Sequence, residues 1–405
     1  MSKNSQNNLP LTGVRVLDLT RLIPGACCST SLADAGAEVI KVEEPQVGDY
    51  ERQIRPFIGS MASRFLLLNR NKKSIAIDLK KDNGRKIFLE LVKSADVLIE
   101  GFRPGAMLKL GLDYESLHKL NQKLVYCSIS SFGHDGPCRD EVSHDLNILG
   151  LAGFFHVTGG KDKGSVIPGI QIADAASGAN AAMAILLAIM QRQKTGIGQR
   201  VDISMFDGVL SWMFDAARYA FAGENVSPGG EGRLNGGFPN YNMYETADGK
   251  HIVVGSLETK FKNELLKKLG RQDLIDVDAG TTSSELNQSD RELHDFLTTT
   301  FLTKNRDEWV AEFAPLNICV SPVNSVEEAL DHPQARSREI VFEVDHPSAG
   351  KIKQIGTPLK FSDMQLELDR YPAPEKGEHT REILTGLGYG SENIDELKSE
   401  GVVRE

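Results

Sequence analysis

Short apolar runs alternate with helix-like segments in the first part of the chain. The stretch GVRVLDLT (13–20) is apolar and bounded by turn residues, which is typical of a buried strand. A helix is expected to begin after Pro24-Gly25 and to end near Ala35-Gly36, and the strand EVIKVE (38–43) follows it. A strand, a helix and a second strand at this spacing predict the βαβ unit of a parallel sheet.

The same alternation recurs further along the chain. KSIAIDL (73–79) predicts a strand, 84–95 a helix, and 96–102 and 124–133 two further strands. We therefore expect an α/β fold with a Rossmann-like, doubly wound large domain, whose ligands bind at the carboxyl ends of the parallel strands. No GxGxxG motif follows the first strand, which argues against a dinucleotide site. Pro24 and Gly25 instead lie where a helix N-terminus could approach a phosphate or an acyl group.

A change of pattern divides the chain. A long helix is expected over 178–194, and the stretch 222–240 is rich in Gly, Asn and Pro, as in a linker. A hairpin with its turn at Asp248-Gly249 opens the next block. We predict a first part of the large domain at 1–221, a linker at 222–240, a smaller inserted α+β domain at 241–330 and a return segment at 331–405 that completes the large domain.

Composition narrows the classes of function. A net charge of −10 excludes a nucleic-acid binder for the chain as a whole. The polar N-terminus has no signal-peptide core, and the longest apolar run, 179–190, is too short to cross a bilayer, so we expect a cytoplasmic protein without a membrane partner. Five cysteines without a CxxC pair indicate reduced thiols, and no metal-ligand spacing is present. A local basic stretch (70–73, 80–81 and 85–86) is either a solvated face or a binding site for a phosphate-rich small ligand.

Two His-Asp pairs are candidates for acid/base chemistry. His134-Asp135 lies in a Gly-Pro turn, where aspartate is an expected turn residue. His144-Asp145, in SHDLN, opens an apolar helix, where Ser143 or Asp145 could be the helix cap. Capping does not require the histidine, which leaves His144 as the stronger candidate.

Two further acids lie in suggestive places. Asp174 precedes a helix of small residues, where it is either a helix cap or a carboxylate held close to a ligand. Glu258 follows a predicted strand, and within reach of a histidine it would orient the ring and raise its basicity.

The order of motifs along nearly the whole chain resembles one enzyme family, the class III CoA-transferases, also called CaiB/BaiF. The resemblance rests on GVRVLDLTRLIPG, GAEVIKVE, LNRNKKSIAIDLK, ADVLIEGFRPG, SSFGHDGP, KTGIGQRVDISMFDG, YETADGKHIVVG and GEHTREILTGLGY. It implies an interlocked homodimer of two-domain chains that acts on acyl-CoA thioesters, with no metal and no cofactor beyond the coenzyme A of the substrate. It also favours a phosphate-binding role for the basic stretch, because Arg and Lys can bind the phosphates of coenzyme A.

The resemblance leaves two chemistries open. A racemase branch, similar to α-methylacyl-CoA racemase, moves the proton next to the thioester with two bases, and its motifs match His144 and Asp174, with Glu258 supporting the histidine. Transferases use the aspartate that matches Asp174 as a nucleophile, usually lack the histidine, and usually carry glutamine where this chain has Ile23. We therefore predict a racemase or epimerase of 2-methyl-branched acyl-CoA thioesters, with a CoA-transferase as the alternative. A binding protein that has lost its chemistry is the least favoured reading, since all three acid/base side chains are present.

The chain also departs from the racemase motifs. Ser143 replaces a glycine, Ile148 replaces a tyrosine, and 175–177 differs as well, which predicts a differently shaped acyl pocket. Glu44 stands where racemases often have the arginine that meets a coenzyme A phosphate. The candidate contacts to the phosphates of coenzyme A are therefore Arg70, Lys72, Lys73 and Arg103. Asp145 is a further candidate contact through the helix that it is expected to cap, because the N–H groups of that helix could stabilise an enolate.

Overall fold

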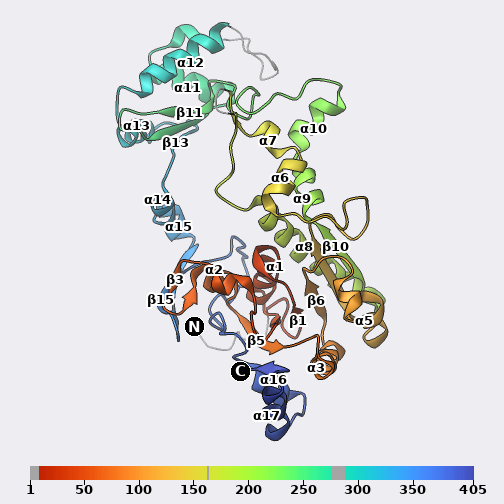
Figure 1. The fold of residues 1–405 in the computed structure, drawn as a ribbon. Coiled ribbons are helices and arrows are strands. Elements are labelled where there is room, and N and C mark those ends of the chain that lie inside the picture. The colour runs from red at the N-terminus through yellow and green to blue at the C-terminus, as the bar shows by residue number, and fades with distance from the viewer. Residues whose placement is uncertain (1–8, 162–163, 276–287) are drawn as a thin grey trace. The chain divides into compact units, whose positions relative to one another are not determined.

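The computed structural model describes residues 9–161, 164–275 and 288–405, which fall into two compact units. The first unit comprises 1–148, 170–209 and 333–405, and the second comprises 149–169 and 210–332. Figure 1 shows the course of the chain. Each unit is described separately below.

A seven-stranded sheet forms the centre of the first unit. Its strands are, in sequence order, β1 (Arg15–Asp18), β2 (Glu38–Glu43), β5 (Lys72–Ile77), β6 (Val97–Glu100), β7 (Val125–Ser130), β10 (Arg200–Ser204) and β16 (Val403–Arg404). They lie side by side in the order β10-β7-β6-β1-β2-β5-β16, and only β16 is antiparallel to its neighbour. Counted along the chain, the six parallel strands have the order 6-5-4-1-2-3, which is the Rossmann order. The predicted parallel α/β fold is therefore confirmed.

Alternation of side chains along each strand gives the sheet two apolar faces. On β1, Val16 belongs to one buried cluster and Leu17 to the other; on β6, Val97 and Leu98 divide in the same way. Helices and short elements complete the unit: α1 (Leu22–Asp34), η1 (Tyr50–Gln53), α2 (Ser63–Leu68), α3 (Asp82–Lys93), α4 (Ala106–Lys109), α5 (Tyr114–Leu120), α8 (Ile172–Thr195), α15 (Pro333–Ser337), α16 (Thr380–Gly386), α17 (Ser391–Ser399), and the hairpins β3 (Phe57–Ile58) with β4 (Met61–Ala62) and β14 (Val341–His346) with β15 (Gly350–Ile355). Because residues of α3, α16 and α17 belong to one cluster and those of α1 and α8 to the other, both faces of the sheet are covered.

Helix α1 begins earlier than predicted, at Leu22, so that Pro24 lies inside its first turn. Proline is tolerated there because the first N–H groups of a helix have no partner within the helix.

Helix α8 is longer than the apolar run from which it was predicted. By length and composition its 24 residues are enough to cross a membrane, which corrects the expectation that no segment reaches this length. Half of its most apolar window is nevertheless buried inside the protein, where Ala181 and Ile185 pack in the core beside α1. One such helix is weak evidence for a membrane span, since core helices of soluble proteins have the same character.

The second unit has its own core around a small antiparallel sheet. The sheet has the order β11-β12-β13, and the turn at Asp248-Gly249 joins its first two strands as predicted. Its elements are α7 (Phe154–Val157), β8 (Gly159–Gly160), β9 (Gly164–Ser165), α10 (Phe214–Phe221), β11 (Tyr241–Glu245), β12 (His251–Gly255), α11 (Thr259–Lys268), η2 (Gln272–Leu274), α12 (Gln288–Phe301), α13 (Arg306–Phe313), β13 (Val320–Pro322) and α14 (Val326–Leu330). Two helices, α6 (Asp145–Leu151) and α9 (Met205–Trp212), begin in the first unit and end in the second.

This unit extends beyond the predicted small domain of 241–330. It also includes 149–169 and 210–221, which were predicted as large domain, and the predicted linker 222–240. Hydrogen bonds distant in sequence explain the difference: Asn235 Nδ2 donates to the Val157 carbonyl at 3.2 Å, and the Gly229 N–H donates to the His156 carbonyl at 2.9 Å.

Candidate active site

A cleft opens at the carboxyl edge of the parallel sheet. Its volume is about 110 Å³, and it lies where the strand order reverses, beside the ends of β1, β2, β5 and β6. In sheets of this topology, ligands bind at such a switch point. The lining residues are Leu19, Thr20, Arg21, Val42, Glu43, Glu44, Gly48, Asp49, Ile77, Asp78, Leu79, Lys80, Phe102 and Leu110.

Two cations reach this cleft. The Arg21 guanidinium lies 5.0 Å from the ring centroid of Tyr50 and 5.7 Å from that of Phe102, and its Nη1 donates to the Tyr50 hydroxyl at 3.0 Å. Lys80 is exposed. Arg103, a predicted phosphate contact, is exposed directly after Phe102. A flat guanidinium held against two rings leaves its remaining N–H groups in a fixed orientation, which suits recognition of an anion.

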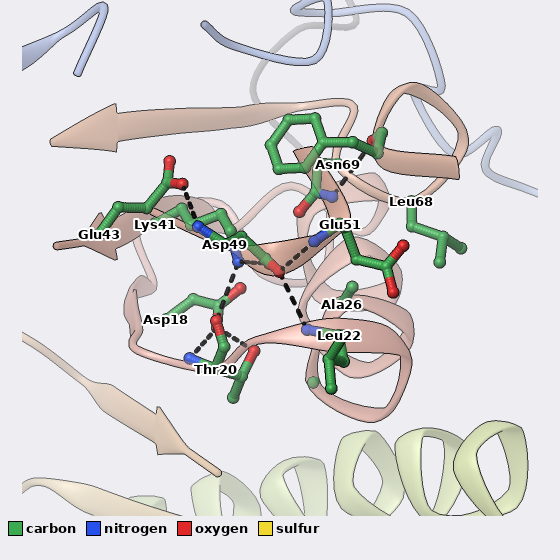
Figure 2. Close-up of polar contacts among 12 residues, drawn as sticks. Asp18, Thr20, Leu22, Ala26, Lys41, Glu43, Asp49, Glu51, Leu68 and Asn69 are labelled. Carbon is green, nitrogen blue, oxygen red and sulfur yellow. Dashed lines mark hydrogen bonds and ion pairs between the residues drawn. The ribbon is translucent and has the colours of Figure 1, made fainter. Parts of the chain in front are cut away.

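A buried cluster of charges adjoins the cleft, which Asp49 lines, and Figure 2 shows Asp49 together with Asp18 and Lys41. Lys41 Nζ lies 2.7 Å from Asp49 Oδ2, and both side chains are fully buried. Lys72 Nζ lies 3.6 Å from Asp18 Oδ2 and donates to Asn69 Oδ1 at 2.8 Å. Burial raises the pKa of Asp18 and the charges of Lys41 and Lys72 lower it, with a net shift downward. The cluster therefore keeps its carboxylates ionised, as structural ion pairs do.

The cluster also holds the turn between β1 and α1. Asp49 Oδ1 accepts from the Leu22 N–H at 3.1 Å and from the Glu51 N–H at 3.0 Å. Leu22 has φ of 65°, a left-handed conformation that is uncommon without glycine and needs such support. The Asp49 carboxylate thus holds both the chain at Leu22 and the chain at Glu51.

Three of the predicted phosphate contacts have partners elsewhere. Arg70 is buried and pairs with Asp34, with Nη2 and Oδ2 2.6 Å apart. Lys72 belongs to the buried cluster, and burial lowers its pKa to about 8. Lys73 pairs with Glu382 at 2.7 Å and with Glu38 at 3.4 Å. Arg70 and Lys72 are buried and paired, so neither fits a contact with a phosphate of coenzyme A. Each would have to leave a carboxylate or an amide oxygen without a partner.

Asp145 caps a helix, but not the one that was expected. It is the first residue of α6, and its Oδ1 accepts from the N–H groups of Ala173 at 2.7 Å and Asp174 at 3.2 Å. These two N–H groups belong to the first turn of α8, where no partner within the helix exists. Asp145 therefore caps α8 across 28 residues of sequence.

Asp174 is consequently not used as a cap. It is the third residue of α8, is half-buried, and its carboxylate has no hydrogen-bond partner among the described residues. Burial, followed by the charge of Asp145, raises the pKa of Asp174 to about 6; Arg64 opposes this shift, and Glu51 adds to it. A carboxylate with a pKa near neutrality is ionised at pH 7 and is a better proton acceptor than an ordinary aspartate.

His144 lies at the start of α6, on the side of Asp145 in the contact between Asp145 and α8. It is exposed, it directly precedes Asp145, and its N–H donates to Asn147 Oδ1 at 3.2 Å. Its ring has no hydrogen-bond partner in the described part of the chain. The Asp145 cap thus brings the chain at His144 next to the chain at Asp174.

Glu258 belongs to the second unit. It is exposed, and it immediately precedes α11, where its carbonyl accepts from the Phe261 and Lys262 N–H groups at 3.0 Å each. Its predicted support of His144 stays a prediction.

The sequence patterns missed several residues of this region. Arg21 and Phe102 were not singled out, although Arg21 directly follows the predicted strand 13–20 and Phe102 ends the predicted strand 96–102, at the edge where ligands were expected. Glu51 and Arg64 are a second omission, and no local pattern marks them, because the pair forms between η1 and α2.

Comparison with known proteins decides the family. The model of CoA-transferase family III matches residues 11–380. The chain belongs to CoA-transferase family III. This membership confirms the resemblance predicted from the motifs.

Both chemistries of family III occur among similar proteins. The chain is 33% identical over 404 residues to the succinyl-CoA:glutarate CoA-transferase of Homo sapiens, with 99% of this chain and 92% of that protein covered. It is 34% identical over 402 residues to the alpha-methylacyl-CoA racemase of Mus musculus, with 97% of each chain covered. The crystal structure of a CAIB/BAIF family protein from Brucella suis matches with a TM-score of 0.81 at 32% identity, covering 94% of this chain and all of that one. Family III membership alone therefore does not choose between proton transfer and acyl transfer.

Proposed function

We propose that the chain is an acyl-CoA racemase or epimerase that inverts the α-carbon of a 2-methyl-branched acyl-CoA thioester. The observation that carries the proposal is the Asp145 cap, which satisfies the start of α8 and leaves both Asp174 and the His144 ring without a structural partner among the described residues. Two titratable groups on adjoining chain segments that are not otherwise engaged are what a two-base proton transfer requires.

The proposed reaction has two steps. Asp174, as carboxylate, accepts the α-proton from one face of the substrate, and the C–H electron pair moves into the thioester to form an enolate. The protonated His144 then donates a proton to the opposite face, and the enolate electrons form the new C–H bond. For the other enantiomer the two residues exchange roles. Glu258 is proposed to orient His144, as the resemblance to the racemases implies.

Coenzyme A is proposed to occupy the cleft at the carboxyl edge of the sheet. Three cations at or beside this cleft, Arg21, Lys80 and Arg103, are not buried in ion pairs, and we propose that they contact its phosphates. The turn 20–25 leads from this cleft to α8, because a side chain at Gly178, one turn after Asp174, would approach the Pro24 carbonyl to 2.6 Å. We propose no metal and no cofactor beyond the coenzyme A of the substrate, since two bases suffice for the proton transfer.

A CoA-transferase is the second candidate, and the transferases among the relatives favour it. Here the Asp174 carboxylate would attack the thioester carbonyl and expel the CoA thiolate, giving an acyl anhydride. The thiolate would then attack the Asp174 carbonyl, release the first acid and leave a CoA thioester on Asp174, which an acceptor acid resolves.

One experiment separates the two candidates. The protein is incubated with a 2-methylacyl-CoA in deuterated water, with and without a free carboxylic acid, and deuterium at the α-carbon is followed. Exchange without the acid supports the racemase. Turnover only with the acid, together with an acyl group on Asp174 that hydroxylamine traps, refutes it.

His144→Ala is the internal check of this experiment. A base on one face should slow exchange from one enantiomer by about 10²- to 10⁴-fold. An unchanged rate from both enantiomers contradicts the assignment of His144.

We further propose that two chains associate and that the dimer is cytoplasmic. Helix α8 carries a row of exposed apolar side chains at helical spacing, and burying them against a second copy would remove this surface from water. The row consists of Met183, Leu186, Leu187 and Met190. Sedimentation velocity with Leu187→Glu against wild type tests the association.

A further inference from the structure

Glu51 and Arg64 form an ion pair that none of the roles above uses. Arg64 Nε lies 2.5 Å from Glu51 Oε2. The Glu51 side chain is 1% exposed, whereas that of Arg64 is 36% exposed. Glu51 Oε1 is buried without a hydrogen-bond partner among the described residues, so the contact uses one N–H of the guanidinium. The edge formed by Nη1 and Nη2 has no partner in the described chain.

The pair is held rigidly on the protein side. Figure 2 shows Asp49 between Lys41, Leu22 and Glu51, with its Oδ1 accepting from the N–H groups of the last two. Asp49 is in turn fixed by the fully buried Lys41. Arg64 is therefore oriented by a carboxylate whose backbone is anchored to the buried cluster.

The same turn joins the pair to Asp174. The chain at Leu22 shares the Asp49 oxygen with Glu51, and the chain at Pro24 and Cys27 packs against Gly178 of α8, where an added Cβ would lie 2.7 Å from the Cys27 Cβ. The charges of Arg64 and Glu51 act on Asp174, and those of Glu51 and Asp174 act on the Cys27 thiol. The Glu51–Arg64 pair is thus connected, through the chain at 22–27, to the start of α8, which carries Asp174.

The proposed reaction needs a hydrogen-bond donor to the thioester oxygen, and the first N–H groups of α8 do not supply it. Whether Asp174 takes a proton or attacks the carbonyl, the negative charge that it gives up moves to the thioester oxygen. The N–H groups of Ala173 and Asp174, which would otherwise be ready to bind an anion, are occupied by Asp145. A cation with an unused pair of N–H groups beside Asp174 compensates this movement without a change in the net charge of the site.

We propose that Arg64, oriented by Glu51, is a catalytic residue that donates to the thioester oxygen as negative charge develops there. The proposal rests on the proposed function, namely that Asp174 acts at an acyl-CoA thioester. Glu51 is then a positioning residue.

The first test is the rate of α-carbon exchange in Arg64→Gln across pH. We expect the kcat of the high-pH plateau to fall by about 10²- to 10³-fold, with KM changed by less than about threefold. Removal of the cation also raises the pKa of Asp174, so the acidic limb should move to higher pH. If Arg64 only tuned Asp174, the rate would recover fully above the new limb, and that result overturns the proposal. Arg64→Lys, which keeps the charge without the planar fork, should retain part of the rate.

A second test does not depend on turnover. A CoA thioether with a nitroalkyl chain, ionised to the nitronate, carries negative charge on oxygen as the enolate does, and the corresponding alkyl thioether is its neutral control. Arg64→Gln should weaken nitronate binding at least about tenfold and leave thioether binding unchanged. Equal effects on the two ligands overturn the proposal.

Arg381→Gln is the matched control, since Arg381 forms an exposed pair with Asp395 and Glu405 outside the proposed site. Failure of the proposed function would be seen separately, as a wild type without exchange or acyl transfer, while the binding comparison still decides the role of Arg64.

Discussion

Two groups of charges in the first unit have opposite electrostatics. In the buried cluster beside the cleft, Asp18 and Asp49 each face a lysine, and their pKa values are lowered. At the start of α8, Asp174 faces another carboxylate and a partly buried surrounding, and its pKa is raised. The first arrangement stabilises charge and fixes the fold. The second arrangement destabilises the charged form of Asp174, which makes this carboxylate more reactive as a base or nucleophile. Burial alone thus does not identify a catalytic acid; the sign of its neighbours does.

The largest expected effect separates the two groups by activity. Asp174→Asn removes the carboxylate with little change of shape, and we expect the rate of α-carbon exchange to fall by about 10³- to 10⁴-fold. Asp207→Asn, at an exposed carboxylate of α9, is the control and should leave the rate within twofold. Stopped-time mass spectrometry of deuterium uptake measures both. A rate loss below tenfold in Asp174→Asn would remove Asp174 from the mechanism.

The next effect separates them by stability. Lys41→Met leaves the buried Asp49 carboxylate without its ion-pair partner and removes a positive charge that also acts on Asp18, so the free energy of unfolding should fall by about 3–5 kcal/mol. Lys80→Met, at an exposed lysine of the cleft, should change it by less than about 0.5 kcal/mol. Urea unfolding followed by circular dichroism gives both values. Equal stabilities would mean that the cluster does not hold the fold.

How far the sequence predicts this molecule differs between these two groups. The strand EVIKVE was located at its observed bounds, and the parallel sheet followed from recurring apolar runs, because these patterns are local. Local composition was misleading at Arg70 within the basic stretch, because it does not reveal that Arg70 meets Asp34 across 36 residues. Asp145 was expected to cap its own helix, and only the tertiary contact with Ala173 shows that it caps α8.

A smaller effect concerns the contact between the two acids. Asp145→Asn retains an oxygen that can accept from Ala173 but removes the charge that raises the pKa of Asp174. The acidic limb of the pH–rate profile should therefore move to lower pH. Asp145→Ala should in addition cost about 1 kcal/mol of stability through loss of the cap. Profiles of kcat/KM and thermal unfolding of both variants measure this, and an unmoved limb would contradict the assigned cause of the pKa shift.

The smallest effect is a stability gain at the catalytic position. The unfolded chain has the ordinary aspartate pKa of 3.8 and the folded chain about 6, so the folded state binds more protons between these values. Stability therefore falls as pH rises through this window. Because Asp174 is partly exposed, the full shift overstates the cost, and Asp174→Asn should stabilise the protein by about 1 kcal/mol at pH 7.5. The gain should shrink toward pH 4. A gain that is independent of pH would show that the carboxylate charge is not its origin.

The two outer strands of the large sheet suggest how the sheet avoids pairing with other molecules. On one side, β16 pairs antiparallel with β5, Val403 opposite Ile77, and occupies the backbone groups that another molecule could otherwise join. On the other side β10 is an outer strand that carries Arg200 and Asp202, and charged side chains discourage pairing between molecules. The edge at β5 is thus covered by a strand of the same chain, and the edge at β10 carries charged side chains that oppose pairing. A fusion or truncation that displaces the last few residues would open the first edge, and it would convert a folded enzyme into a template for aggregation.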